Sequence, residues 1–164
     1  MNISAVQMSH ATVVVAIEFE RFISTFESLL GKYDPRVGAQ IREDPQAADR
    51  MLQAMEGEQN LMIFWRLNHG GLFSMIGQSC NAMRYTIGNP RIALQMTRHD
   101  VRAALYVPFN ILVIENDDGS VRVEYDLPSS LLGQFGNTDV LQIATLLDQK
   151  IRGLLDATTR VANL

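Results

Sequence analysis

The sequence contains little of what marks a secreted or membrane-bound protein. Cys80 is the only cysteine among 164 residues, so no disulfide can form within the chain. The first 17 residues contain neither Lys nor Arg, and the apolar run at 13–17 ends at Glu18. That run is too short and wrongly flanked for a signal peptide or a membrane span. We therefore expect a soluble, cytoplasmic protein of bacterial type, with no membrane partner and in a reducing compartment.

An excess of positive charge is also missing. The chain has 14 Lys and Arg against 18 Asp and Glu, which gives a formal net charge of −4. Without a positive field to gather phosphate groups, nucleic acid is not expected as a partner. The three histidines, His10, His69 and His99, show no metal-ligand spacing among themselves or with Cys80. We expect no metal site and no cofactor.

What the sequence does contain is enough apolar residues, 47% of the chain, for one well-buried core. A β-branched strand at 12–17 leads into a helix at 19–30, whose apolar residues follow three-and-four spacing. Gly31 is expected to end that helix as a C′ residue. The segment 34–59 is more polar and is interpreted as an insertion carrying one helix. The expected apolar side of that helix consists of Ala48, Met51, Leu52 and Met55.

The second half of the chain predicts a sheet closed by a long helix. Strands are expected at 61–67 and 81–87, with Leu61, Ile63, Trp65 and Leu67 on one face of the first. Asp118-Gly119 predicts a hairpin between strands 109–114 and 121–125. After a turn at 128–130, Asn137 or Thr138 caps a terminal helix with a wide apolar stripe. The fold class is α+β: one compact domain with a mixed or mainly antiparallel sheet, helices packed on it, an inserted helix and a long C-terminal helix.

One candidate site lies at a predicted helix start. Asn89 can cap a helix that begins at Pro90, and a helix start presents free N–H groups with a partial positive charge. Arg91 adds a guanidinium, so Gly88, Asn89 and Arg91 could bind a carboxylate or phosphate. The alternative is that Asn89 and Pro90 only start the helix and turn the chain.

Other candidates stand elsewhere in the chain. His69 ends a strand and precedes two glycines, where a backbone or ligand can approach closely. Tyr125 is either a binding residue or a core-edge tyrosine with a hydrogen-bonded hydroxyl. Cys80 is interpreted mainly as a small, buried hydrophobic residue. The candidate ligand-binding residues are therefore His69, Gly88, Asn89, Arg91 and Tyr125, and no catalytic set is identified.

Five segments in order carry a family resemblance. They are 87–90 (Ile-Gly-Asn-Pro), 107–109 (Val-Pro-Phe), 111–115 (Ile-Leu-Val-Ile-Glu), 118–119 (Asp-Gly) and 121–125 (Val-Arg-Val-Glu-Tyr). This order resembles the bacterial and archaeal domain of unknown function 302 family, and the segments at 12–31 and 61–69 are similar to its first half. The resemblance implies a compact α+β domain and family-typical positions for His69, Asn89, Pro90, Pro108 and Tyr125. It implies no activity, and the segment 34–59 and the long terminal helix depart from the family pattern.

Three hypotheses about function follow. The first is a module that binds a small-molecule or anionic ligand, or a partner, near His69 and Asn89. The second is an enzyme that uses His69 as general base with Tyr125 or Cys80. The third is a homodimer formed through the apolar faces of the inserted and terminal helices.

Overall fold

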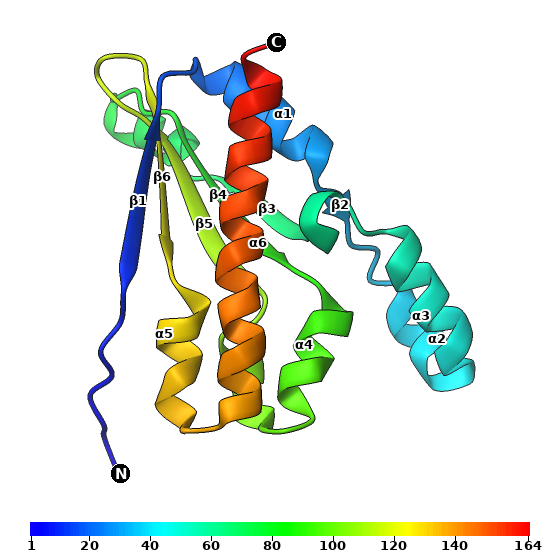
Figure 1. Cartoon of the computed structure of the whole chain (residues 1–164). Helices are drawn as coiled ribbons and strands as arrows, with labels where there is room; N and C mark the ends of the chain where they lie inside the picture. Colours follow the sequence, from blue (N-terminus) through cyan, green and yellow to red (C-terminus); the bar gives the residue numbers. More distant parts are fainter.

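The computed structural model describes residues 1–164 and places a six-stranded sheet at the centre of the molecule (Figure 1). The strands are β1 (His10–Val15), β2 (Gly31–Lys32), β3 (Met62–Asn68), β4 (Ala82–Gly88), β5 (Phe109–Glu115) and β6 (Val121–Asp126), in the order β1-β6-β5-β4-β3-β2. All neighbours are antiparallel except β2 and β3, which are parallel. The predicted α+β class with a mixed, mainly antiparallel sheet is confirmed.

The helices lie between and after the strands. They are α1 (Phe19–Leu29), α2 (Val37–Glu43), α3 (Pro45–Ala54), α4 (Pro90–Thr97), α5 (Pro128–Leu132) and α6 (Thr138–Ala162), with short 3-10 helices η1 (Glu58–Asn60), η2 (Gly70–Ile76), η3 (Val101–Leu105) and η4 (Gly133–Phe135).

The two predicted helix caps are confirmed: Asn89 Oδ1 accepts from Arg91 N, and Asn137 Oδ1 accepts from Asp139 N and Val140 N. The predicted turn at 128–130 is instead the first turn of α5, because Pro128 suits a helix start. None of the helices combines the length and apolarity that a membrane crossing requires.

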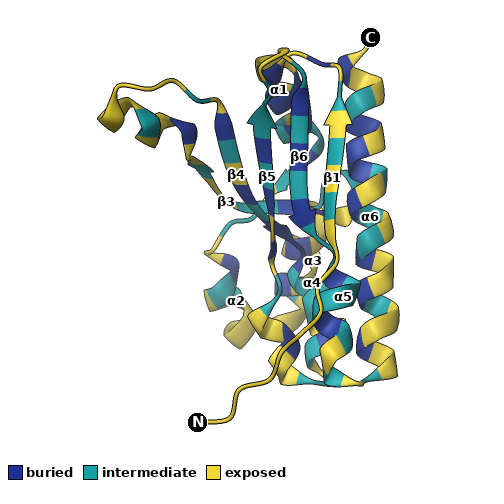
Figure 2. Cartoon of the chain, turned by 90° about the vertical axis from the view of Figure 1, so that its left-hand side faces the viewer, coloured by how far each residue is buried: buried dark blue, intermediate teal, exposed yellow.

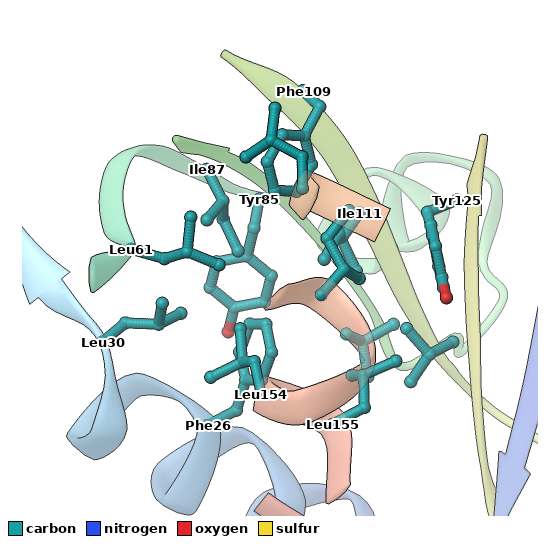
Figure 3. Close-up of a cluster of buried hydrophobic side chains, with 14 of the residues drawn as sticks. Phe26, Leu30, Leu61, Tyr85, Ile87, Phe109, Ile111, Tyr125, Leu154 and Leu155 are labelled. Atoms are coloured by element: carbon teal, nitrogen blue, oxygen red, sulfur yellow. The ribbon is translucent and has the colours of Figure 1, made fainter. Parts of the chain in front are cut away.

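The main core fills the space between one face of the sheet and helices α1 and α6 (Figure 3). Tyr85, Ile87 and Ile111 point from the strands toward the helices, and Leu154 of α6 meets them there. The rings of Phe26 and Tyr85 stand edge to face with centroids 5.2 Å apart. The Tyr85 hydroxyl donates to Glu27 Oε1 over 2.8 Å, so its polar atom is satisfied at the core's edge. The other face of the sheet is open to solvent (Figure 2).

The prediction that Leu61, Ile63, Trp65 and Leu67 share one face of β3 is wrong, because the strand contains a β-bulge. The register runs from Ile63 opposite Ile87 to Trp65 opposite Thr86, so Phe64 is the extra residue. Before the bulge Ile63 packs against the core, and after it Trp65 lies on the open face with 53% of its surface exposed. The period-two pattern therefore holds on each side of Phe64 but not across it.

The segment predicted as one inserted helix forms a hairpin of two, α2 and α3, since Pro45 begins a new helix after Asp44. Val37, Ala48 and Leu52 form a small apolar cluster of their own, separate from the main core. Met55 packs against this cluster as expected, whereas Met51 is exposed. The hairpin stands to the side of the sheet, beyond α4 as seen from α6 (Figure 1).

Two glycines form the neck of this hairpin. A Cβ on Gly31 would overlap the carbonyl oxygen of Met55 and lie 2.9 Å from the amide nitrogen of Gly57. A Cβ on Gly57 would in turn overlap the backbone at Gly31. Gly31 follows the C-cap Leu30 and so lies at the expected C′ position of α1, but it is not among the positive-φ glycines and it also opens β2. It is glycine because two backbones touch there.

Candidate functional site

A cleft of about 740 Å³ opens between the α2–α3 hairpin on one side and helices α4 and α6 on the other. Its walls are mostly apolar, with Ile41 from the hairpin, Leu94 from α4, and Ile143, Leu146 and Leu147 from α6. Polar side chains gather at one part of the lining, where the hairpin neck, the start of α4 and the middle of α6 meet. They are Asp49, Glu56, Asn60, Asn89, Arg91 and Lys150. The site is therefore amphipathic.

Asn89 is the buried centre of the polar part, with only 5% of its surface exposed. Its Oδ1 caps α4 by accepting from Arg91 N over 2.8 Å. Its Nδ2 donates to Glu56 Oε1 over 2.8 Å and to the carbonyl oxygen of Asn60 over 2.7 Å. Gly88, directly before it, packs against Pro108, whose Cβ would lie 2.9 Å from a Cβ at that position. Asn89 thus ties the start of α4 to the hairpin neck.

Arg91 faces the same neck and contacts two carboxylates there, those of Asp49 and Glu56. Its Nε donates to Asp49 Oδ1 over 2.8 Å, and one terminal nitrogen donates to Glu56 Oε1 over 2.9 Å. At this helix start a ligand was expected to bring a carboxylate to Arg91. The chain itself supplies two, from Asp49 and Glu56. Burial alone would raise the pKa of Glu56, but hydrogen bonds from Asn89, Arg91 and Asn60 outweigh it and hold that pKa below its ordinary value.

Lys150 stands at the same end of the cleft, on α6. Its ammonium donates to the carbonyl oxygen of Gln59 over 3.0 Å and to Asn60 Oδ1 over 2.9 Å. Gln59 and Asn60 both have positive φ, 57° and 61°, which is costly for residues with a Cβ. Such strain persists only where surrounding contacts enforce it. Asn60 has two such contacts, because its Oδ1 accepts from Lys150 and its Nδ2 donates to Glu56 Oε2 over 2.8 Å. The strained pair supplies both acceptors of the Lys150 ammonium.

A second cavity of about 250 Å³ borders the first across the opening turn of α4. It is lined mainly by apolar side chains, among them Tyr33, Phe64 and Pro108. The rings of Tyr33 and Phe64 stack with centroids 4.3 Å apart, so the extra residue of the β-bulge connects the hairpin to the sheet. Asn89 and Pro90 contribute to the lining of both cavities.

His69 and Tyr125 lie away from this cleft. His69 follows β3 at the end opposite Gly88, since Met62 pairs with Gly88 and Asn68 with Met83. Six residue steps along a strand separate the two ends by about 20 Å. Tyr125 lies on β6 against the core, where burial raises the pKa of its phenol. The structure therefore brings Gly88, Asn89 and Arg91 together and leaves the other two candidates elsewhere.

The pairs that the enzyme hypothesis requires are not formed. The His69 side chain forms no hydrogen bond. The next residue, Gly70, packs on the carbonyl oxygen of Cys80. Tyr125 belongs to β6, which is three strands away from β3, the strand that His69 follows. No group of three or more His, Cys, Asp or Glu side chains is arranged to hold a metal ion.

A second polar cluster lies on the open face, where His10 of the edge strand reaches over β6. Its Nδ1 is 2.7 Å from Asp126 Oδ1 and its Nε2 is 2.8 Å from Glu124 Oε2. Carboxylates only accept, so the two contacts together require the imidazolium form, in which both ring nitrogens donate. The hydrogen bonds to Asp126 first, and to Glu124 second, raise the pKa of His10 above 6.5. This cluster fastens β1 to β6.

We expect this contact to stabilise the fold only while His10 is protonated. Because the folded-state pKa is raised, the contribution is fully present below pH 6.5 and is lost as the pH rises through the folded-state value. The urea midpoint of the wild type should fall relative to that of His10→Gln between about pH 5.5 and about pH 9. A constant difference between the two proteins across this range would contradict the expectation.

The sequence reasoning did not identify Asp49, Glu56, Asn60 or Lys150. Asp49 and Glu56 lie in the segment taken as a polar insertion and Asn60 follows it directly, and no local pattern there separates a solvated carboxylate from one that faces a helix start. Lys150 could have been identified from the sequence. It follows Ile143 and Leu147 at helical spacing, so it places a cation on that apolar stripe.

Comparisons with known proteins agree with this architecture. The family model described as Domain of unknown function DUF302 matches residues 37–158. Among solved structures, the crystal structure of the uncharacterized conserved protein DUF302 from Bacillus stearothermophilus is similar, with a TM-score of 0.65 and 15% sequence identity over 90% of this chain and 96% of that chain. At that identity the likeness shows the fold alone. No curated protein matches the chain.

The matched range takes in most of 34–59 and nearly all of α6, and it begins after the strand and helix at 12–31. The interpretation of 34–59 as an insertion relative to the family therefore stays a prediction.

Proposed function

We propose that this chain, which belongs to the Domain of unknown function DUF302 family, is a module that binds a small molecule in the cleft between the α2–α3 hairpin and helices α4 and α6. The observation that carries the proposal is the cleft's composition: about 740 Å³ with apolar walls and one polar end. Sites for small molecules typically measure about 300–1,000 Å³ and combine apolar walls with a few fixed polar groups. Here Asn89, Arg91 and Glu56 fix one another by hydrogen bonds.

Exposed apolar side chains at the cleft support the same proposal. Ile41, Leu94 and Leu146 are 46%, 63% and 49% exposed, and they come from three different elements that face one cleft. Leaving such side chains in water is unfavourable, and a bound apolar group would cover all three.

The alternatives have less support. An enzyme with His69 as general base would need a partner within hydrogen-bond reach, and neither Cys80 nor Tyr125 provides one. A homodimer through the inserted and terminal helices would need free apolar faces. The main stripe of α6, including Ala144, Ile151 and Leu154, is instead buried in the chain's own core.

Octan-1-ol, a neutral probe, is expected to bind in the cleft. Burying about five methylene groups at about 0.8 kcal/mol each gives about 4 kcal/mol, or a Kd of about 1 mM. In a ¹H–¹⁵N NMR titration of the full chain, the shifted amides should cluster at the cleft. Leu146→Trp, which places a large side chain in the cleft from an exposed position, should weaken binding at least about tenfold.

Leu141→Trp is the matched control. Leu141 is also on α6 and 41% exposed, but it does not line the cleft, so its replacement should leave the titration unchanged. Shifts that fall outside the cleft, or that persist unchanged in Leu146→Trp, would reject the proposed function. Native mass spectrometry of protein freshly purified from its host adds a second readout: mass lost on denaturation of the wild type should be reduced in Leu146→Trp and kept in Leu141→Trp.

A further inference from the structure

We infer that the cleft's ligands are amphipathic monocarboxylates with an apolar body about 10 Å long, and that Lys150 binds the carboxylate. The inference rests on the proposed function and adds the chemical class of the ligand to it. Three features of the cleft carry it: the length of its apolar stripe, the hydrogen bonds of the ammonium, and the charges beside it.

The apolar stripe on α6 sets the length of the ligand. Ile143, Leu146 and Leu147 line the cleft, followed by Lys150, at positions i, i+3, i+4 and i+7 of one helix. These residues share one helix face, and seven residues at 1.5 Å per residue span about 10 Å. A body of this length that lies along the stripe also meets Leu94 from α4 and Ile41 from α2 on the opposite walls. Lys150 then stands at its polar end.

The ammonium of Lys150 is held in place but not neutralised. Two of its hydrogens are donated to Gln59 O and Asn60 Oδ1, and no carboxylate of the chain forms an ion pair with it. The third hydrogen has no acceptor in the protein. A ligand carboxylate would accept that hydrogen and bring the charge that the ammonium lacks, which makes a strong, charge-assisted hydrogen bond. The strained residues Gln59 and Asn60 hold the ammonium in advance, so little entropy is lost on binding.

The neighbouring charges limit the ligand to one negative charge. Arg91 forms ion pairs with both Asp49 and Glu56, so these three groups together carry a formal charge of −1. Asn60 connects them to Lys150, since it donates to Glu56 and accepts from Lys150. A dianion such as a phosphate monoester would meet this excess of negative charge with only one cation to offset it. An amine would meet the ammonium of Lys150 and would have to compete with Arg91 for the carboxylates.

The experiment compares four probes with the same eight-carbon body: octanoate, octan-1-ol, octylamine and octyl phosphate. In ¹H–¹⁵N NMR titrations of the full chain near neutral pH, octanoate should bind about tenfold more tightly than octan-1-ol, and more tightly than the other two. In Lys150→Gln the preference for octanoate over octan-1-ol should disappear. In Lys150→Arg, which keeps the charge, it should be retained within about threefold.

The ratio of the two affinities separates a binding role from a structural one. If Lys150 served only to hold Gln59 and Asn60, its replacement would weaken octanoate and octan-1-ol equally and leave the ratio unchanged, and the inference would be overturned. A wild type that prefers octylamine or octyl phosphate, or that binds octanoate no better than octan-1-ol, would overturn it as well. Failure of the proposed function is a different result, in which octan-1-ol itself does not bind in the cleft.

Discussion

Gly31→Ala is expected to destabilise the protein by at least about 3 kcal/mol. The added Cβ would overlap the carbonyl oxygen of Met55 and crowd the amide nitrogen of Gly57 at 2.9 Å. Both neighbours are backbone atoms, so the clash cannot be relieved by rotating a side chain. The neck would have to separate, and β2 would lose its pairing with β3, in which Gly31 lies opposite Met62. Urea denaturation followed by circular dichroism measures the loss.

Gly38→Ala is the control in the same hairpin. Gly38 lies within α2, and a Cβ there meets nothing within 4 Å. Because alanine favours a helix over glycine, this change should stabilise the protein by about 0.5–1 kcal/mol. The same substitution thus has opposite signs at two positions seven residues apart. Similar midpoints for the two variants would show that the neck tolerates a side chain and would contradict the close backbone contact.

The elements that the sequence predicts correctly are those with local causes. A cap lies within three residues of the N–H groups it satisfies, so Asn89 and Asn137 could be identified from their neighbours alone. The hairpin between β5 and β6 depends on a turn residue with positive φ, and Gly119 has a φ of 80°. In each case the residue and its partner lie within a few positions, and the pattern is visible before folding.

The features that the sequence does not reveal concern residues whose partners are distant. The position after a helix accounts for Gly31 locally, but the backbone contact that requires a glycine there involves Met55, which is 24 positions away. The bulge at Phe64 leaves no mark in a run of apolar residues, because Ile63 and Trp65 are both apolar and either face would accept them. Only the register against β4 decides which of them reaches the core.

The candidate site was predicted in part for the same reason. Gly88, Asn89 and Arg91 are contiguous and carry a helix-start signal, and the structure places them together at the cleft. Glu56 and Lys150 reach the same place from segments more than 30 residues away on either side. His69 has a local signal of equal strength, but the antiparallel pairing of β3 with β4 carries it to the opposite end of the sheet.

Glu56→Ala is the second change with a large expected effect, about 2–3 kcal/mol of destabilisation at neutral pH. Glu56 is largely buried and accepts hydrogen bonds from Asn60, Asn89 and Arg91, so its removal leaves Asn60 Nδ2 without this acceptor and the Arg91 guanidinium with Asp49 alone. The cost stays below that of a fully buried ion pair because a third of the Arg91 side chain is exposed. Glu43→Ala, at an exposed carboxylate of the same hairpin, should change stability by less than about 0.5 kcal/mol.

The pH dependence of this loss identifies its cause. The pKa of Glu56 in the folded protein lies below its ordinary value of 4.5, so its contribution is fully present above pH 4.5 and is lost as the pH falls through the folded-state pKa. The difference in unfolding free energy between wild type and Glu56→Ala should therefore be constant from about pH 7 to about pH 5 and shrink below that. A difference that persisted unchanged at acid pH would mean that Glu56 stabilises the neck by packing. In that case its carboxylate would not be what joins α4 to the hairpin, and the contacts of Asn89 with Asn60 and of Arg91 with Asp49 would have to do so.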